Sequence, residues 1–555
     1  MLKAAWLVAL IALWAVLVLC TMLPGSAQAS SGAGGWAGTG IIRAPGGQYL
    51  TDTYGRRLQL HGVNLVAKCG GGARPAADAG TPCIGPAQGP KLAYLLSPAA
   101  RDPARRFTIA DARTLVRLGF NMVRLGIVWE GLEPGPRAVG ANDPRYCAPH
   151  RPGTEFPALG PADPYDSATV RAYLTRTDRI VALLTRAGLR VVIDMHQDAW
   201  GSAFSYGAGT TPWNGEGAPL WATCTGSAAP ALPIGWGAAY GVPAVQTAIH
   251  HFWANDVRAD LQGQFARVWA AVARHFRGAP DVLGYEVANE PNDFLSPRFD
   301  AELQCDYGGR RQEPRSCAAS RPAALHDGLI GAIRTADPQH VVLFEPSGAT
   351  DYGAPERIGI GEPLRFGGLA LAFHVYGSVA QQLAMTARER DRTRTDQPGG
   401  PAWIMDEFGA SNNAPAIAQT ASLADQVNLS WAFWSAFQLD DPTAGGPQEG
   451  LLDQRTRRPH PRLAHALAVP YPWATAGTPG SESFDRRTLT FRYRYAVARD
   501  VHAPTEIELP PYTFAHGYTV RAASARVVSR RDAPLLELMA NRGAARVSLI
   551  VRARR

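Results

Sequence analysis

The sequence predicts a closed (β/α)8 TIM barrel over residues 58–469, followed by a small C-terminal antiparallel β-sandwich over residues 470–555. Between 58 and 469, short continuous apolar runs alternate with segments of helical periodicity, which is typical of a parallel sheet covered on both faces. An open doubly wound sheet is the alternative, but the chain has no glycine-rich nucleotide turn to support it. After residue 470, apolar and polar residues alternate without intervening helices, which indicates a sandwich.

Residues 1–29 are expected to be an export signal. Lys3 precedes an unbroken apolar run over 4–23, and Ala27 and Ala29 fit an A-x-A cleavage site. The run is nearly long enough to span a bilayer, so an uncleaved membrane anchor is the alternative. Both interpretations predict a secreted or cell-surface protein. Residues 30–57 are expected to form a flexible lead-in and a hairpin, from 49–52 and 57–60, that covers the bottom of the barrel.

Strand and helix patterns alternate along the barrel region. Strands are expected at 61–66, 121–129, 190–198, 282–287, 340–346, 369–376, 401–409 and 431–437. Helices are expected at 108–118, 167–187, 256–276, 322–336 and 417–428. In the sandwich, 471–480 is predicted to be a turn-rich connector because it contains two prolines and two glycines. Short strands are expected at 489–497, 505–509, 518–521, 526–529 and 547–551.

The charge of the chain does not indicate a nucleic-acid-binding protein. The formal net charge of +8 is spread thinly, arginine dominates lysine, and neither a dense basic run nor a zinc-ligand pattern is present. A mild attraction to anionic surfaces, including a membrane surface, is compatible with this balance. The sequence does not indicate an oligomeric state.

Six cysteines follow the signal, and an even number in an exported protein indicates disulfides. The most local pairing joins Cys69 to Cys83, Cys305 to Cys317, and Cys147 to Cys224. Six cysteines allow many other connectivities, so this pairing stays one hypothesis among them.

Polar side chains gather at the predicted C-terminal ends of the barrel strands, where the active sites of such barrels lie. They are Lys68, Arg124, His196, Asp198, Asn289, Glu290, His374, Tyr376, Glu407 and Trp434. Each alone would more often be a structural or surface residue, but their common location indicates a site. Glu290 and Glu407 each end an apolar strand, which suggests the carboxylate pair of a glycosidase.

The motifs that carry these residues resemble glycoside hydrolase family 5, a retaining (β/α)8 group. They are His61-Gly-Val-Asn64, Asn121-Met-Val-Arg124, Asp194-Met-His-Gln-Asp198, Asn289-Glu290-Pro291, His374-Val-Tyr376 and Asp406-Glu-Phe-Gly409. The wording DMHQDAW, FWAN and EVANEPN is similar to the endoglycoceramidase-related branch, including its β-sandwich tail. The resemblance covers nearly all of the chain after the signal.

The resemblance implies that Glu290 is the general acid/base and Glu407 the nucleophile, with their carboxyl groups about 5 Å apart. If Arg124 contacts Glu407, that carboxylate stays charged and Glu290 carries the proton.

The other strand-end residues are expected to serve the sugar or the nucleophile. Asn289 is expected to bond the sugar 2-hydroxyl, and Tyr376 and His374 to orient the nucleophile. His196 is expected to line the floor, and Trp434 to offer a flat platform for a sugar ring.

Lys68 and Asp198 are expected to contact sugar hydroxyls, although an indirect role for both is an equal alternative. His196, Asp198, Glu290 and His374 could be written as metal ligands, but they lack the short spacings of zinc sites. No metal or other cofactor is therefore expected.

The leaving group is suggested by an aromatic-rich insertion of about 55 residues after the third strand. It contains Trp200, Phe204, Tyr206, Trp213, Trp221, Trp236, Tyr240, Phe252 and Trp253. Most of these rings are expected to form the core of the loop, but some are expected to line an apolar groove for a lipid or sterol. The predicted function is hydrolysis of the sugar–lipid bond of glycolipids. The alternatives are an endoglucanase- or mannanase-type polysaccharide hydrolase, a steryl or simple-lipid β-glucosidase and, more remotely, a non-catalytic carbohydrate-binding barrel.

Overall fold

A computed structural model of the chain describes most of the residues after 39. The described residues are 40–66, 107–135, 139–157, 168–201, 203–206, 213–226, 231–232, 240–291, 320–352, 363–437, 450–453 and 455–554. The predicted signal at 1–29, most of the lead-in, Lys68, Trp236 and four of the six cysteines (Cys69, Cys83, Cys305 and Cys317) lie outside them. In the described part of the chain, no helix has the length and apolar character that crossing a membrane requires.

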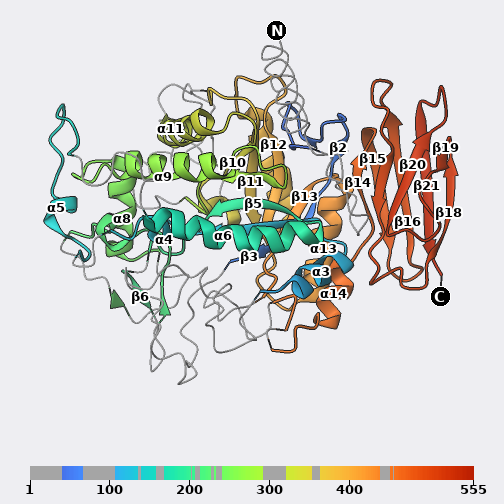
Figure 1. Cartoon of the computed structure of the whole chain (residues 1–555), viewed down its shortest axis with the longest axis horizontal. Helices are drawn as coiled ribbons and strands as arrows, with labels where there is room; N and C mark the ends of the chain where they lie inside the picture. Colours follow the sequence, from blue (N-terminus) through green and yellow to red (C-terminus); the bar gives the residue numbers. More distant parts are fainter. Residues whose placement is uncertain are drawn as a thin grey trace, which may run out of the picture. The chain divides into compact units, whose positions relative to one another are not determined.

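Eight parallel strands close into a barrel, which confirms the predicted fold class (Figure 1). They are β3 (His61–Leu65), β4 (Met122–Ile127), β5 (Arg190–Met195), β9 (Val282–Glu286), β10 (Val341–Phe344), β11 (Leu369–Val375), β12 (Ala402–Phe408) and β13 (Ser430–Phe433). The ring closes where Ala432 of β13 pairs with Gly62 of β3. Every residue of these strands is buried, as the continuous apolar runs predict.

Helices follow or precede these strands along the chain. They are α3 (Ile109–Arg117), α4 (Trp129–Leu132), α5 (Pro144–Cys147), α6 (Ala168–Ala187), α8 (Pro243–Ala254), α9 (Leu261–Phe276), α11 (Ser320–Ala336), α12 (Val379–Arg392), α13 (Ala414–Gln426) and α14 (Pro461–Leu467). Short 3-10 helices lie at η4 (Leu220–Ala222) and η5 (Gly348–Tyr352). Helix α3 begins at a capping box, in which Thr108 and Asp111 each bond the other's backbone amide.

The insertion after β5 has a small sheet and a disulfide. Its strands are β6 (Ser205–Tyr206), β7 (Trp213–Asn214) and β8 (Ala231–Leu232). Cys147 at the end of α5 is bonded to Cys224 after η4, which confirms the third of the predicted disulfides. The bond joins two segments that are 77 residues apart in the sequence.

Two antiparallel sheets form the predicted C-terminal sandwich. One has the order β1 (Leu50–Thr51), β2 (Arg57–Leu58), β14 (Tyr471–Thr475), β17 (Thr505–Glu508), β20 (Leu535–Ala540) and β19 (Ala525–Val527). The other has the order β15 (Gly477–Asp485), β16 (Thr490–Val497), β21 (Arg546–Ala553) and β18 (Tyr518–Ala523). Aromatic and aliphatic side chains, among them Tyr493, Leu536 and Leu549, fill the space between the sheets.

Two details of the sandwich differ from the prediction. The segment 471–480 is not a connector, because it forms β14 and the start of β15. Its prolines are accommodated where the pairing register shifts, between Tyr471 and Ala474 and between Pro479 and Glu482. The predicted N-terminal hairpin forms, but its second strand pairs with β14 and so extends a sheet of the sandwich.

Candidate active site

Glu290 lies just after β9 in a backbone conformation that L-residues rarely adopt, with φ +42°. The Gln197 side chain donates to the carbonyls of Asn289 and Glu290, at 3.0 and 3.2 Å. The amide of Glu290 donates to Glu345 at 3.2 Å. These three bonds fix the turn that presents the Glu290 carboxyl group, which is 8% exposed.

Glu407 is the sixth residue of β12 and is 5% exposed. Its carboxylate accepts hydrogen bonds from Arg124 at 3.0 Å and from the Tyr376 hydroxyl at 2.5 Å. The contact with Arg124 is the one expected to keep Glu407 charged. Tyr376 lies where the sequence placed it, beside the carboxylate that it is expected to orient.

Arg124 is a fully buried cation at the centre of the barrel. Its guanidinium binds Glu286 through two bonds, at 2.9 and 2.7 Å, and donates to the Asn289 side-chain oxygen at 2.7 Å. Burial lowers its pKa, but the carboxylates of Asp194 and Glu286 outweigh burial and raise it. Arg124 therefore stays charged and connects Asn289 and Glu407.

His374 lies between the two glutamates expected to be catalytic. Its Nδ1 is 2.8 Å from Glu290 Oε1, and its Nε2 is 3.7 Å from Glu407 Oε2. Its short contact is thus with Glu290, whereas the sequence had suggested that His374 orients Glu407. Burial opposes protonation of this ring, but the carboxylates of Glu345, Glu407 and others outweigh burial and raise its pKa well above the usual value.

Carboxyl groups crowd this region. Within the described ranges, seven lie within 3.9 Å of Arg124 or His374: Asp194, Glu286, Glu290, Glu345, Asp351, Asp406 and Glu407. Two cations cannot balance so many ionised carboxylates in a buried space. Burial raises the pKa values of Glu345, Asp351 and Asp406 well above their usual range. For Glu286, the Arg124 charge outweighs burial and lowers the pKa. The cluster therefore holds several protons near neutral pH.

His196, Asp198 and Trp434 lie together beside this cluster. His196 Nδ1 is 2.8 Å from Asp194 Oδ2, and its Nε2 is 3.7 Å from Asp198 Oδ2. The His196 ring stacks on Trp434 at 5.5 Å between centroids. Trp434 is only 1% exposed, so the broad face expected to receive a sugar ring is covered in this structure.

The sequence missed five carboxyl groups of this cluster. Asp194, Glu286 and Asp406 lie inside apolar strands, and Glu345 directly follows one. A charged residue within or directly after a buried strand could have indicated these positions, because a buried charge requires a hydrogen-bonding or charged partner inside the barrel. Asp351 lies in η5 and has no such signal.

Three groups of side chains among the described residues could hold a metal ion, with ligand atoms within 4.8 Å of one another. They are His196 with Asp198 and Glu216, Glu286 with Glu345 and His374, and Glu290 with Asp351 and His374. In the second group, Glu286 and Glu345 also contact the Arg124 guanidinium. A metal ion bound there would be repelled by this neighbouring positive charge. The expectation that the reaction needs no metal stays a prediction.

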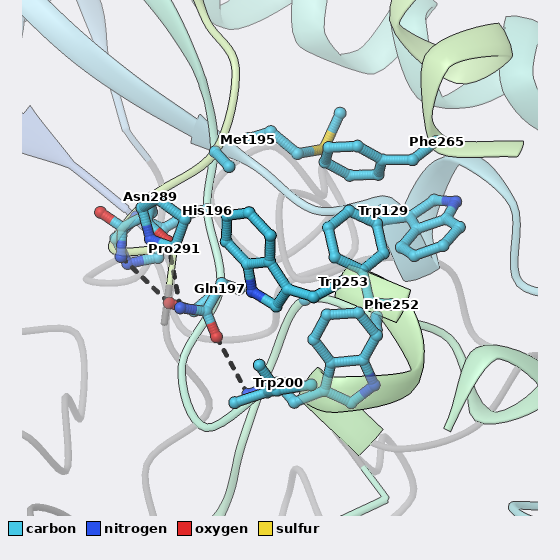
Figure 2. A pocket seen from close by; sticks show the side chains of 14 residues that line it. Trp129, Met195, His196, Gln197, Trp200, Phe252, Trp253, Phe265, Asn289 and Pro291 are labelled. Atoms are coloured by element: carbon cyan, nitrogen blue, oxygen red, sulfur yellow. Dashed lines mark hydrogen bonds between the residues drawn. The ribbon is translucent and has the colours of Figure 1, made fainter. Parts of the chain in front are cut away.

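An apolar pocket of about 520 Å³, including its part open to solvent, begins beside Asn289 (Figure 2). Apolar side chains from α4, α8, α9, the end of β5, the insertion and the segment after β9 line most of it. They are Trp129, Met195, Trp200, Ala218, Ile249, Phe252, Trp253, Phe265, Ala288 and Pro291. Polar residues lie where it meets the carboxyl cluster: His196, Gln197 and Asn289.

The pocket divides the aromatic residues of the insertion into two groups. Trp200, Phe252 and Trp253 line the pocket. This agrees with the expectation that some aromatic residues of the insertion line an apolar groove. Phe204, Trp221 and Tyr240 are buried in the hydrophobic core. The side chains of Tyr206 and Trp213 lie outside the described part of the structure.

Family models match two parts of the chain. Residues 104–439 match the cellulase family (glycosyl hydrolase family 5), and 470–549 match the glycoside hydrolase family 5 C-terminal domain. The chain is 27% identical over 523 residues to endoglycoceramidase I of Rhodococcus hoagii strain 103S, covering 89% of this chain and 85% of that protein.

Solved structures show the same fold. Endo-glycoceramidase II from Rhodococcus sp., solved as a lactosyl-enzyme intermediate and with the ganglioside GM3, superposes with TM-score 0.63 at 22% identity. The match covers 92% of this chain and 100% of that one. Cryptococcus neoformans sterylglucosidase 1 superposes with TM-score 0.65 at 16% identity, covering 93% and 97%.

Proposed function

The chain belongs to glycoside hydrolase family 5, and we propose that it hydrolyses the bond between a sugar and a lipid in glycolipids. The observation that carries the substrate class is the apolar pocket beside Asn289. A general acid must lie next to the leaving group that it protonates. Asn289 and Pro291, the two chain neighbours of Glu290, line this pocket, so its position suits the leaving group. Because its lining is mostly aromatic and aliphatic, it suits a hydrocarbon chain better than a second sugar.

The proposed reaction is a double displacement, the mechanism typical of this family. The Glu407 carboxylate attacks the anomeric carbon while Glu290 gives its proton to the departing lipid oxygen, and the carbon–oxygen bond to the lipid breaks. In the second step Glu290 takes a proton from water, the water oxygen attacks the same carbon, and Glu407 is released. The products are the free sugar and the lipid alcohol.

The surrounding residues support these roles by charge. Arg124 brings a positive charge to the proposed nucleophile, because its guanidinium donates a hydrogen bond to the Glu407 carboxylate at 3.0 Å. Asn289 has its side-chain oxygen held by Arg124, and its amide group donates to the backbone of Gln197 at 3.1 Å. Its remaining amide hydrogen is the one proposed to meet the sugar 2-hydroxyl.

A steryl or simple-lipid β-glucosidase is the second candidate. The chain shares its fold with Cryptococcus neoformans sterylglucosidase 1, although at 16% identity this likeness shows the fold alone. The same pocket suits a sterol. An endoglucanase- or mannanase-type activity has support only from the broader family to which cellulases also belong.

Export belongs to the same proposal. The apolar run over 4–23 and the small residues at 27 and 29 support a signal, and the Cys147–Cys224 disulfide suits an oxidising compartment. Glycolipids of a cell surface would be accessible to such a protein.

The test is hydrolysis of a substrate panel in nonionic detergent by the wild-type chain, Glu290→Gln and Glu407→Gln. Glu155→Gln, at an exposed position, is the matched control. The panel contains glucosylceramide, galactosylceramide, a ganglioside, a steryl glucoside, soluble cellulose and mannan. Release of an intact sugar head and free ceramide, lost only in the two site variants, is expected.

Other outcomes separate the alternatives. Cleavage of the steryl glucoside alone would favour the second candidate, and cleavage of the glucans alone would refute the glycolipid proposal. Full activity in either site variant would refute the assigned roles.

A further inference from the structure

The net positive charge of the chain comes mainly from its C-terminal sandwich. Residues 470–555 contain 14 arginines, no lysine and 7 aspartates and glutamates, so they account for nearly all of the net charge of +8. These arginines do not form a dense basic run in the sequence, because along each strand they alternate with residues that point to the opposite face. The strand pairing is what brings these arginines together.

Five exposed arginines share one face of the four-stranded sheet: Arg492, Arg494, Arg521, Arg546 and Arg552. Directly paired residues of antiparallel strands point to the same side. Arg492 pairs with Ile550, which pairs with Arg521 on the next strand. Arg546 pairs with Ala496, and Arg552 lies between Thr490 and Thr519. We call these five residues the arginine face.

The opposite side of the same strands belongs to the core. Tyr493 and Tyr495 on β16 and Val547, Leu549 and Val551 on β21 alternate with the arginines and are buried against the other sheet. Figure 1 shows β16, β18 and β21 in the C-terminal sandwich. The arginine face is therefore the solvent side of a sheet whose inner side is fixed.

Small or neutral residues separate the arginines, and carboxylates do not neutralise them. Among the residues that the structure describes, no salt bridge joins any of the five to an aspartate or glutamate. Asp485 lies on β15 at the edge of this sheet, where it pairs with Thr490. Its carboxylate accepts hydrogen bonds from the backbone amides of Arg487 and Thr488. Ordinary protein surfaces mix both signs of charge, whereas a face of one sign attracts an opposite charge.

We propose that the arginine face binds the surface of an anionic lipid bilayer. Neighbouring strands lie about 5 Å apart and alternate residues about 7 Å apart, so the guanidinium groups form a planar array. Guanidinium groups bind phosphate and carboxylate oxygens through paired hydrogen bonds, which suits lipid headgroups. The choice of a bilayer rests partly on the proposed function, because a glycolipid substrate lies in a membrane.

The test is cosedimentation of the full chain with phosphatidylcholine vesicles, with and without phosphatidylserine. The vesicles contain no glycolipid, so binding is measured independently of the proposed activity. Neutral vesicles report any affinity of the apolar N-terminal run. The wild type is expected to bind anionic vesicles more tightly than neutral ones, and less tightly as salt rises.

The triple variant Arg492→Gln/Arg494→Gln/Arg521→Gln is expected to lose affinity for anionic vesicles by tenfold or more. Each basic residue at such a surface contributes about fivefold. The control removes the same charge from barrel helices through Arg113→Gln, Arg179→Gln and Arg388→Gln, all exposed. The control is expected to bind like the wild type, and a triple arginine-to-lysine variant of the face to retain most of the affinity.

Equal loss in the control would overturn the proposal, because net charge and not the face would be responsible. Unchanged binding by the glutamine variant, or lost binding by the lysine variant, would also overturn it. Binding to heparin without binding to anionic vesicles would assign the face to acidic polysaccharides instead. Hydrolysis of glycolipid in detergent micelles should be the same in all variants, so failure of the proposed function would be seen separately.

Discussion

Glu407 accepts hydrogen bonds from two donors that differ in charge, Arg124 and Tyr376. A guanidinium favours the ionised carboxylate and also orients it, whereas a phenol hydroxyl mainly orients it. The two effects can therefore be separated at Tyr376, because the hydroxyl can be removed without changing the charge of the site.

Replacing Tyr376 by phenylalanine is expected to lower kcat roughly 10- to 100-fold, since a hydrogen bond to a charged group contributes about 1.5–3 kcal/mol. KM should change less, because the lost bond is to Glu407 and not to substrate. Steady-state kinetics on a water-soluble aryl β-glycoside measure both, and thermal unfolding checks the fold. Tyr54→Phe, at a tyrosine that is 50% exposed, is the control. A kcat within twofold of the wild type would show that Tyr376 does not position the nucleophile.

The barrel strands were predictable because each one is a continuous apolar run with a polar end. The same runs placed Asn289, Glu290, His374 and Glu407 at one end of the barrel, where the structure brings them together. Arg124 was expected there too, but it lies inside β4 and reaches Asn289 and Glu407 from within the barrel. The contact of His374 with Glu290 was not predictable, because it depends on the height of β11 relative to the turn after β9. Strand pattern fixes which side a residue faces, but not this height.

Long-range pairing also gave no local signal. The hairpin of β1 and β2 pairs with β14, more than 400 residues later in the chain. This pairing uses backbone hydrogen bonds, which do not depend on particular side chains and so leave no signal in the sequence. The prolines of β14 and β15 read as turn residues, because a single sequence does not reveal a register shift. Helix α12 was missed for a related reason: its buried stripe is narrow and includes the polar Gln382 and Thr386.

Helix α8 supplies part of the apolar pocket through Trp253. Trp253→Leu is expected to lower kcat/KM for a ceramide glycoside by roughly tenfold, because a ring in contact with the lipid contributes about 1.5 kcal/mol or more. Activity on a soluble aryl glycoside should stay within about twofold. The control is Trp403→Leu, which removes an equal ring from β12 where it packs on Phe373. Equal losses on both substrates would contradict a role of this wall in binding lipid.

At the scale of the whole molecule, the sandwich and the barrel meet through buried polar groups. Tyr471 of β14 stacks on His61 of β3 at 3.5 Å and donates to the carbonyl of Gly119. Asp425 of α13 accepts hydrogen bonds from Gln59 and Trp431, and its Oδ1 also lies 3.0 Å from His61 Nε2. The contact between sandwich and barrel therefore rests on specific hydrogen bonds between buried side chains. Some of these side chains are titratable, so the stability of the contact is expected to depend on pH.

Glu482 of β15 lies in this contact and is buried. Burial, and then the neighbouring Asp425, raise the pKa of Glu482 well above its usual value, although a hydrogen bond with Gln59 lowers it in part. A carboxyl group whose pKa is higher in the folded state than in the unfolded state favours folding while it is protonated. Its contribution is complete below the unfolded pKa and is lost as the pH rises through the folded pKa.

Glu482→Gln is therefore expected to become more stable than the wild type as the pH rises, because glutamine stays neutral in the same space. The two melting temperatures should be similar at acidic pH. At alkaline pH that of the variant should be higher by about 1 °C for each kcal/mol recovered, because the unfolding entropy of so long a chain is large. Thermal unfolding at several pH values measures this difference. Glu508 is partly buried and desolvation raises its pKa to about 8, but it is present in both proteins, so its effect on the melting temperature cancels in the comparison. Asp500→Asn, at an exposed carboxylate, should follow the wild type throughout. If the difference between Glu482→Gln and the wild type does not change with pH, folding does not raise the pKa of Glu482, and the assignment of a neutral carboxyl group to the contact between sandwich and barrel is wrong.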